Sequence, residues 1–295
     1  MEIVKVSFQG FCKGVIRAIA IINKALKNDN IRKPIYMLGG LVHNKHIINA
    51  YENKGIIIVD NINDIYEGTV IITAHGVSDS IIDLIKSRNL DILNTTCFDV
   101  IKTHNIIKEK INDGYDVLFY GKNTHPETKG VMGISKDIHL IETSKDIDLL
   151  NITNPKLFFA TQTTMSYLDV IDMLKIIQNK YPHIDSYEEV CSATKVRQTA
   201  LIEEAKNADL CIVVGDPKSN NTNKLKEVCL KHTSTPCVMV EIIKDLESYD
   251  FSNVFRIVVT AGASTPPVIV DEVINGIKNN DFNSYLQDDD YLKIR

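Results

Sequence analysis

The segment VSFQGFCKGVIRAIAI, residues 6–21, decides how this chain is built, because it places Cys12 where one kind of structure gives way to another. The residues before Cys12 continue an apolar run that is typical of a strand. The residues after it place Val15, Ile19 and Ile22 on one face of a helix. Cys12 therefore lies at a junction between a strand and a helix and belongs to neither apolar interior.

Two further cysteines have the same surroundings. The segment LDILNTTC ends at Cys97 and the segment HIDSYEEVC ends at Cys191, and both have strand character. Helix-like sequence follows each of them, over residues 99–111 and 192–205. A context that recurs three times indicates three copies of one structural module.

The segments that follow each cysteine keep the same register. An apolar strand leads into a glycine, and a polar side chain follows four residues later, at His43, His125 and Ser219. A second apolar run in each module ends near His75, Thr163 or Ser264. Strands that alternate with helices predict α/β units, here with about four parallel strands in each.

The chain is therefore predicted to fold as three similar α/β domains with small parallel sheets, arranged with pseudo-threefold symmetry around a common axis. The predicted modules are residues 13–97, 98–191 and 192–280, and residues 281–295 form a C-terminal tail. The first strand, residues 2–8, has no module before it, so residues 1–12 are expected to complete the sheet of the third module. The acidic tail is interpreted as a solvated terminus.

The composition excludes several classes of protein. The 295 residues are 44% hydrophobic, and the net charge of −5 is spread without long basic runs, which argues against a nucleic-acid partner. No apolar run approaches the roughly 18 residues that span a bilayer, and the N-terminus lacks the features of a signal peptide. We therefore expect a cytoplasmic protein without a membrane partner. The six cysteines include no CxxC pair, so no disulfide framework or zinc finger is indicated.

Parallel sheets gather their ligands at the carboxyl ends of the strands, where Cys12, Cys97 and Cys191 are expected to converge. Thiolates at helix N-termini are favoured by the helix dipole, which lowers the pKa of cysteine, and three of them suit a metal cluster. A structural zinc site needs four protein ligands. An iron–sulfur cluster held by three cysteines leaves one iron open to substrate. The other cysteines are interpreted as buried apolar thiols: Cys211, Cys229 and Cys237.

The loops at the same edge carry hydrogen-bond donors and one notable acid. His43, His75 and His125, together with the run SNNTN that begins at Ser219, would form an anion site for phosphate oxygens. Glu127 is interpreted as a general acid, the alternative being an ordinary helix N-terminal glutamate. The remaining histidines are interpreted as surface or core residues: His46, His104, His139, His183 and His232.

Nine short motifs in order carry a resemblance to a known family. They are GFCKGV, LVHN, AHGVS, TTC, HPE, TQTT, CSATKVRQ, SNNTN and TAGAS, and they span nearly the whole chain. This pattern resembles the 4-hydroxy-3-methylbut-2-enyl diphosphate reductase family, also called the IspH or LytB family. The resemblance implies three α/β domains around one 4Fe–4S cluster with three cysteine ligands and one open iron. It also implies the last step of the non-mevalonate isoprenoid pathway, which yields isopentenyl and dimethylallyl diphosphates, with a ferredoxin or flavodoxin as electron donor.

The resemblance assigns roles to individual residues. Cys12, Cys97 and Cys191 match the cluster ligands, Glu127 matches the residue that relays protons, and Thr163 matches its hydrogen-bonding partner. The residues expected to bind the allylic diphosphate substrate are His43, His75, His125, Thr163, Thr164, Ser219, Asn220, Asn221 and Ser264.

Two positions depart from the family pattern, and so does the segment GDPK, which replaces a more usual Gly-Lys-Asn-like lead into the SNNTN loop. Phe98 replaces a common proline, which leaves the packing of the cluster and its redox potential open. Asn220 replaces a second serine, so an altered phosphate contact is expected.

Two other functions stay open at this point. A quinolinate-synthase-like enzyme would use the open iron as a Lewis acid without net electron input. A non-enzymatic iron–sulfur sensor would hold a cluster but tolerate the loss of Glu127. Consumption of a reduced viologen that depends on the hydroxylated allylic diphosphate would distinguish the reductase from both.

Overall fold

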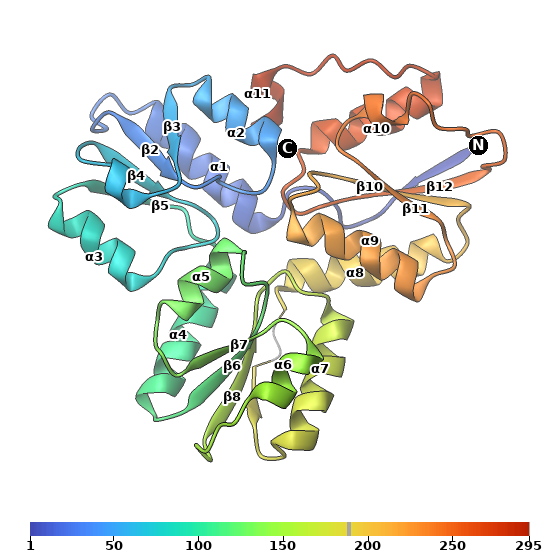
Figure 1. Ribbon diagram of the computed structural model, residues 1–295. Helices are drawn as coiled ribbons and strands as arrows, with labels where there is room; N and C mark the ends of the chain where they lie inside the picture. The colour runs from blue at the N-terminus through green and yellow to red at the C-terminus, as the bar shows by residue number, and fades with distance from the viewer. Residues whose placement is uncertain (188–189, 295) are drawn as a thin grey trace.

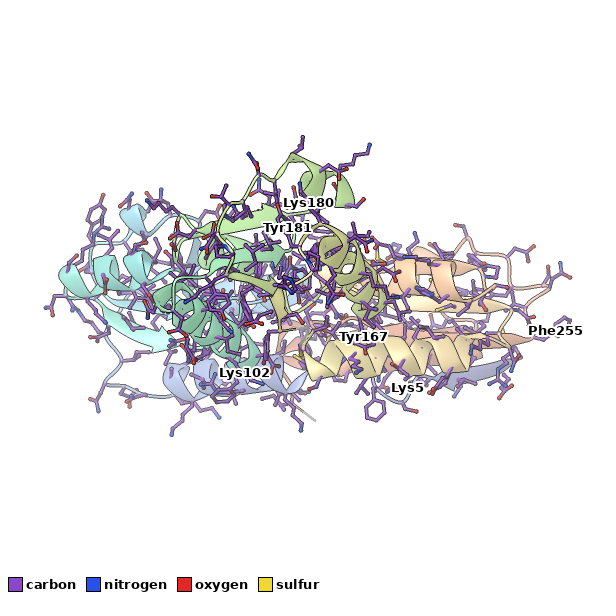
Figure 2. All side chains as sticks on the ribbon, turned by 90° about the horizontal axis from the view of Figure 1, so that it is seen from below. Lys5, Lys102, Tyr167, Lys180, Tyr181 and Phe255 are labelled. Carbon is purple, nitrogen blue, oxygen red and sulfur yellow. The ribbon has the colours of Figure 1, made fainter. Side chains whose placement is uncertain are left out.

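The computed structural model describes residues 1–187 and 190–294. Three lobes surround a common centre, and each lobe is one four-stranded parallel sheet with helices packed on it (Figure 1). Seen from below, the molecule is thinner than it is wide (Figure 2). The prediction of three α/β units with four parallel strands each is confirmed.

The first lobe begins directly after Cys12, with helix α1. Its sheet has the strand order β3-β2-β4-β5. The strands are β2 (Ile35–Leu38), β3 (Ile56–Val59), β4 (Thr69–Ile72) and β5 (Asp91–Asn94), and the helices are α1 (Lys13–Leu26), α2 (Lys45–Glu52), the short 3-10 helix η1 (Ile62–Asp64) and α3 (Asp79–Ser87).

The second lobe repeats this arrangement with the strand order β7-β6-β8-β9. The strands are β6 (Asp116–Tyr120), β7 (Ile138–Ile141), β8 (Leu157–Thr161) and β9 (Asp185–Ser186), and the helices are α4 (Phe98–Asn112), α5 (Pro126–Met132), α6 (Ser144–Leu149) and α7 (Tyr167–Lys180).

The third lobe takes its fourth strand from the N-terminus of the chain. Its strand order, read in the same direction, is β11-β10-β12-β1, and Ile3 of β1 is in register with Ile257 of β12. Its elements are β1 (Glu2–Lys5), α8 (Ser192–Ala205), β10 (Leu210–Val214), α9 (Asn220–His232), β11 (Cys237–Val240), the 3-10 helix η2 (Ile243–Leu246), β12 (Arg256–Ala261) and α10 (Pro267–Asn279). The predicted boundaries at residues 97 and 191 stay predictions.

Each sheet is buried on both faces, which explains why its central strands are continuously apolar. In β10, for example, Leu210 and Ile212 belong to one apolar cluster and Cys211 and Val213 belong to another. In the first and second lobes, too, the sheet separates two apolar clusters. Apolar packing on both faces therefore holds each sheet in place, and the sheets position the loops at the strand ends. None of the helices in the described part of the chain has the length and apolar character that a membrane span needs.

The interpretation of the acidic tail as a solvated terminus is wrong. Its helix α11 (Asp288–Tyr291) packs against α2 of the first lobe and α10 of the third (Figure 1). Tyr291 and Leu292 are buried, and the Tyr291 ring lies 4.8 Å from the His46 ring. The tail thus ties two lobes together, because Leu292 joins the apolar cluster of the first lobe and Tyr291 joins that of the third.

We expect Tyr291→Ala to lower the stability of the protein by about 3 kcal/mol, since a buried aromatic ring would leave a cavity. The thermal unfolding midpoint, followed by circular dichroism, measures this loss. Tyr285→Ala serves as the control, because the Tyr285 side chain is 69% exposed. Equal shifts for the two variants would contradict the packing role of the tail.

Candidate functional site

The predicted site residues lie where parallel strands end, at the same three positions in every lobe. Strands β2, β6 and β10 each lead to the first polar position of their lobe. Strands β4, β8 and β12 lead to the second, and strands β5, β9 and β1 lead to a cysteine. The first positions are His43, His125 and Ser219, the second are His75, Thr163 and Ser264, and the cysteines are Cys97, Cys191 and Cys12. The sequence repeat therefore reflects a repeat in space.

Each of the three cysteines is the N-cap residue of a helix, of α1, α4 or α8. None of their side chains makes a capping hydrogen bond. Their backbone N–H groups donate to carbonyl oxygens of the loop after the neighbouring strand: Cys12 to Ala263 at 3.1 Å, Cys97 to Ala74 at 3.0 Å and Cys191 to Thr163 at 3.1 Å. This repeated bond fixes the backbone of each cysteine in the same way, and all three thiols line the pocket at the centre of the molecule.

Gly14 keeps space open beside two of the thiols. A Cβ atom at this position would lie 2.8 Å from Sγ of Cys97 and 3.7 Å from Sγ of Cys12. A side chain here would therefore collide with sulfur. The absence of a side chain suits a bulky group held between the two cysteines.

The expectation that helix N-termini lower the pKa of these thiols is wrong for two of them. Burial raises the pKa of Cys97, and burial together with the nearby Asp99 carboxylate raises the pKa of Cys191 to about 12. Desolvation outweighs the helix dipole here, because both thiols are largely withdrawn from water. A bound metal would reverse the balance, since a coordinated thiol loses its proton outright.

Glu127 lies in the first turn of α5, is 1% exposed and is held at both carboxylate oxygens by one residue. The Thr163 backbone N–H donates to Oε1 at 2.8 Å and the Thr163 hydroxyl donates to Oε2 at 2.9 Å. Burial nevertheless raises the pKa of Glu127 to about 7, and these two hydrogen bonds act in the opposite direction. The group can therefore both hold and release a proton near neutral pH.

We expect Thr163→Val to raise the pKa of Glu127 further, because the hydroxyl that stabilises its carboxylate form is lost. The Thr163→Ser variant keeps the hydroxyl and is the matched control. Carbon-13 NMR of labelled glutamate, recorded against pH, measures the shift. An unchanged midpoint in the valine variant would show that the hydroxyl does not control this carboxyl group.

Three histidines meet on the other side of the same space. The His43 ring centre lies 4.9 Å from that of His75 and 5.3 Å from that of His125. Burial lowers the pKa of all three, that of His125 to about 3, so the rings are neutral. Nε2 of His43 and Nδ1 of His75 are buried without a hydrogen-bond partner. The cluster thus offers unpaired polar atoms to a ligand, and its nitrogen atoms lie close enough together to hold a metal ion as well.

Hydroxyl and amide groups of the third lobe complete this side. The Ser264 hydroxyl contacts the backbone oxygen of His43 at 3.1 Å and the Ser219 hydroxyl at 3.4 Å. The Asn221 amide accepts from the backbone N–H of Ala263 and donates to the Thr194 hydroxyl. The side chains are therefore oriented before any ligand arrives.

Asn220, one of the two departures from the family pattern, bonds to a neighbouring loop. Its amide nitrogen donates to the backbone oxygen and to the hydroxyl of Thr164, each at 3.0 Å. Its Oδ1 atom is buried without a partner. The side chain therefore links the second and third lobes across the site and keeps one acceptor unused.

Phe98, the other departure, lines a second cavity together with Cys12, Cys97 and Cys191. Its side chain is 64% exposed, and the guanidinium of Arg17 lies 4.3 Å from the ring centre. The ring is therefore largely exposed to solvent at the edge of this cavity.

Three buried polar residues of the site were not predicted from the sequence. The Gln162 side chain accepts a hydrogen bond from the Lys122 backbone N–H and donates one to the Thr164 hydroxyl. Arg197 donates to the backbone oxygen of Gly10 at 2.7 Å, and burial lowers the pKa of its guanidinium. Thr194 holds Asn221. The motifs TQTT and CSATKVRQ contain Gln162, Thr194 and Arg197, so these motifs could have indicated the three residues.

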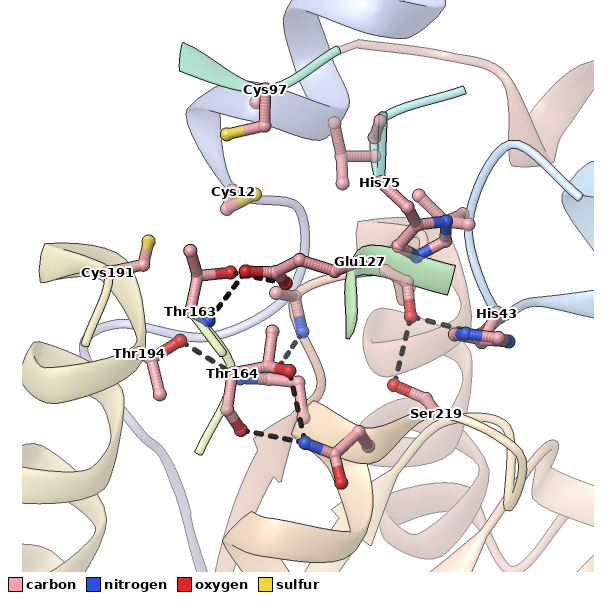
Figure 3. Close-up of a pocket in the computed structure, with 18 of the residues that line it drawn as sticks. Cys12, His43, His75, Cys97, Glu127, Thr163, Thr164, Cys191, Thr194 and Ser219 are labelled. Carbon is pink, nitrogen blue, oxygen red and sulfur yellow. Dashed lines mark hydrogen bonds between the residues drawn. The ribbon is translucent and has the colours of Figure 1, made fainter. Parts of the chain in front are cut away.

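All predicted site residues line one pocket. In Figure 3 the three thiols lie on one side, His43 and Ser219 lie on the other, and Glu127 with Thr163 lies between them. The lining residues are Cys12, His43, His75, Cys97, His125, Glu127, Thr163, Thr164, Cys191, Ser219, Asn220, Asn221 and Ser264. The fold and this pocket define a three-lobed α/β protein with a central thiol-lined site that can hold a metal centre beside an anion.

Comparisons with known proteins place the chain in a family. The family model described as LytB protein matches residues 3–278. A 4-hydroxy-3-methylbut-2-enyl diphosphate reductase of Lysinibacillus sphaericus is 43% identical and covers 96% of this chain and 90% of its own, and that of Bacillus subtilis is 42% identical, covering 95% and 92%. The chain therefore belongs to the LytB family.

A solved structure agrees with this placement. The E-1-hydroxy-2-methyl-but-2-enyl-4-diphosphate reductase of Plasmodium falciparum superposes with a TM-score of 0.90, at 34% identity, over 97% of this chain and 91% of that one. The resemblance seen in the motifs is confirmed. The chain is an oxidoreductase of an iron–sulfur family, and neither the quinolinate-synthase-like function nor a sensor is supported.

Proposed function

We propose that this chain reduces 4-hydroxy-3-methylbut-2-enyl diphosphate to isopentenyl and dimethylallyl diphosphates, the last step of the non-mevalonate isoprenoid pathway. Two electrons and two protons enter, the carbon–oxygen bond to the 4-hydroxyl breaks, and water leaves. The observation that carries the proposal is the pocket in which three N-cap cysteines face a buried acid and a set of neutral donors. The names of the relatives agree with it.

Cys12, Cys97 and Cys191 would hold one 4Fe–4S cluster. Among the described residues, the groups whose ligand atoms all lie within 4.8 Å of one another do not include these three cysteines. A single ion with metal–sulfur bonds of about 2.3 Å needs such close ligands. More widely placed thiols and the space beside Gly14 suit a larger centre. When bound, the cluster supplies the electrons and an iron with an open coordination position.

The histidines, together with the polar side chains of the second and third lobes, would bind the diphosphate. Neutral imidazoles donate hydrogen bonds without introducing the desolvation cost of a buried charge. Nε2 of His43 and Nδ1 of His75, which lack protein partners, are suited to face phosphate oxygens. The complete proposed set is His43, His75, His125, Thr163, Thr164, Ser219, Asn220, Asn221 and Ser264.

Glu127 would deliver a proton to the departing hydroxyl group. Its carboxyl group lies between the thiols and the anion side of the pocket (Figure 3). The pKa of about 7 keeps a large fraction of the acid protonated at neutral pH. Thr163 would position the carboxyl group through its two hydrogen bonds.

A redox assay tests the proposed function. Anaerobically purified protein should oxidise reduced viologen only when the hydroxylated allylic diphosphate is present, and the products should appear in gas chromatography after dephosphorylation. Inorganic pyrophosphate in place of the substrate is the control for unspecific oxidation. Viologen oxidation that does not depend on the substrate would overturn the proposal. In the cell a ferredoxin or a flavodoxin would replace the viologen.

A further inference from the structure

The third lobe contains a second group of three cysteines that the reductase function does not use. Cys211 lies in β10, Cys229 in α9 and Cys237 in β11. Their sulfur atoms all lie within 4.8 Å of one another. The strand residues Cys211 and Cys237 are register partners on adjacent strands, and helix α9 brings Cys229 onto the same face of the sheet. None of the three lines the pocket described above.

The surroundings of this thiol triad are apolar. Cys211 and Cys229 are fully buried, and the apolar cluster around them includes Val213, Leu225 and Val258. Besides the other two thiols, the Cys229 sulfur contacts the Thr233 hydroxyl at 3.5 Å and the Thr235 backbone oxygen at 3.9 Å. The thiols therefore face one another more than they face any strong hydrogen-bonding group.

We propose that Cys211, Cys229 and Cys237 form a separate binding site for a soft, closed-shell metal ion, with Cu(I) as the best-fitting ion. Three thiolates around one ion at bonds of about 2.3 Å would stand about 4 Å apart, which small side-chain rotations reach from the observed spacing. Each cysteine that binds releases its thiol proton to solvent. The single positive charge of the ion then offsets one of the three thiolate charges that the apolar core would otherwise exclude.

The composition of the group favours Cu(I) over zinc or a second iron–sulfur cluster. Soft thiolate ligands select Cu(I), zinc and iron–sulfur centres. Zinc in a closed structural site and each iron of a cluster need a fourth ligand. Within residues 1–187 and 190–294, no histidine or carboxylate joins the triad at this spacing. A three-coordinate ion is therefore the better match.

An entry path is available at the edge of the sheet. Strand β11 is one of the two edge strands of the third sheet, and Cys237 is its first residue. Cys237 is partly exposed, whereas Cys211 and Cys229 are not. An ion can thus reach Cys237 first and pass inward to the other two thiols.

The test compares Cu(I) retention by the parent with that by the variant Cys211→Val, Cys229→Ala, Cys237→Val. Both proteins are purified anaerobically with their cluster, titrated with Cu(I), and dialysed against a bathocuproine chelator. We expect the parent to retain about one equivalent more copper than the variant, with equal iron content. X-ray absorption at the copper edge should show three sulfur neighbours at about 2.3 Å.

Two results would overturn the site. Equal copper retention in both proteins would show that the triad binds nothing, and iron lost in step with copper uptake would place the copper at the pocket cysteines. Circular dichroism checks that the triple variant is folded. If it is not, Cys237→Ser alone decides the question: copper retention that falls by about tenfold or more supports the site, and unchanged retention refutes it. None of these measurements depends on turnover, so they stand apart from the test of the reductase function.

Discussion

Replacing Glu127 with glutamine is expected to lower turnover by about 10²–10⁴-fold while leaving the Michaelis constant for the diphosphate nearly unchanged. The amide has the size of the carboxyl group and keeps an oxygen for the Thr163 backbone N–H, but it cannot supply a proton. Steady-state viologen oxidation at saturating substrate measures the loss. The Michaelis constant separates a lost proton donor from a damaged anion site.

The pH dependence of turnover provides a second test of the role of Glu127. The pKa of Glu127 is raised to about 7, and a general acid acts only while it is protonated. Turnover by the parent should therefore fall as the pH rises through about 7, and this limb should be absent in the glutamine variant. The exposed Glu142→Gln change in the same lobe is the control and should behave like the parent. A glutamine variant with full turnover and an unchanged pH profile would remove Glu127 from the mechanism.

Replacing Cys191 with serine is expected to reduce both the iron content and the activity to background. Each pocket cysteine comes from a different lobe, so the loss of one leaves only two protein ligands for the cluster. Hydroxyl oxygen is a poor replacement, because iron–sulfur clusters are held by thiolates. Iron and sulfide analysis together with the visible absorption spectrum measure the cluster directly, without reference to turnover.

Cys237→Ser is the matched control for this experiment. Cys237 is partly exposed like Cys191, but it lies outside the pocket. This variant should keep about four irons per chain and normal activity. If both variants lost iron equally, the cluster would not be assigned to the pocket cysteines. If Cys191→Ser kept its iron, the three-cysteine ligand set would be wrong.

Much of the fold could be read from the sequence because its signals are local and repeated. A cysteine between a strand-like and a helix-like run occurs three times, and each occurrence became the N-cap of a helix. The apolar runs around Leu118 and Ile212 predicted strands, since a parallel sheet covered on both faces needs continuously apolar strands. The convergence of the site then followed from one rule, that parallel strands present their carboxyl ends at one edge.

Other features depended on contacts between residues far apart in the chain. The acidic residues around Tyr291 suggested a solvated tail, but α2 supplies a surface for the tyrosine ring that local sequence does not encode. The helix dipole suggested acidic thiols, but the desolvation of Cys97 and Cys191 depends on what all three lobes bring around them.

The sequence by itself thus determined the three repeated units, the edge of each sheet at which chemistry takes place, and the residues that lie there. Only the tertiary structure decided the protonation of Glu127, the pairing of Asn220 with Thr164, and the meeting of Cys211, Cys229 and Cys237. The physical reason is that strand and helix patterns are set by neighbours along the chain. Burial and side-chain pairing are set by neighbours in space, which come from different lobes or from different elements of one lobe.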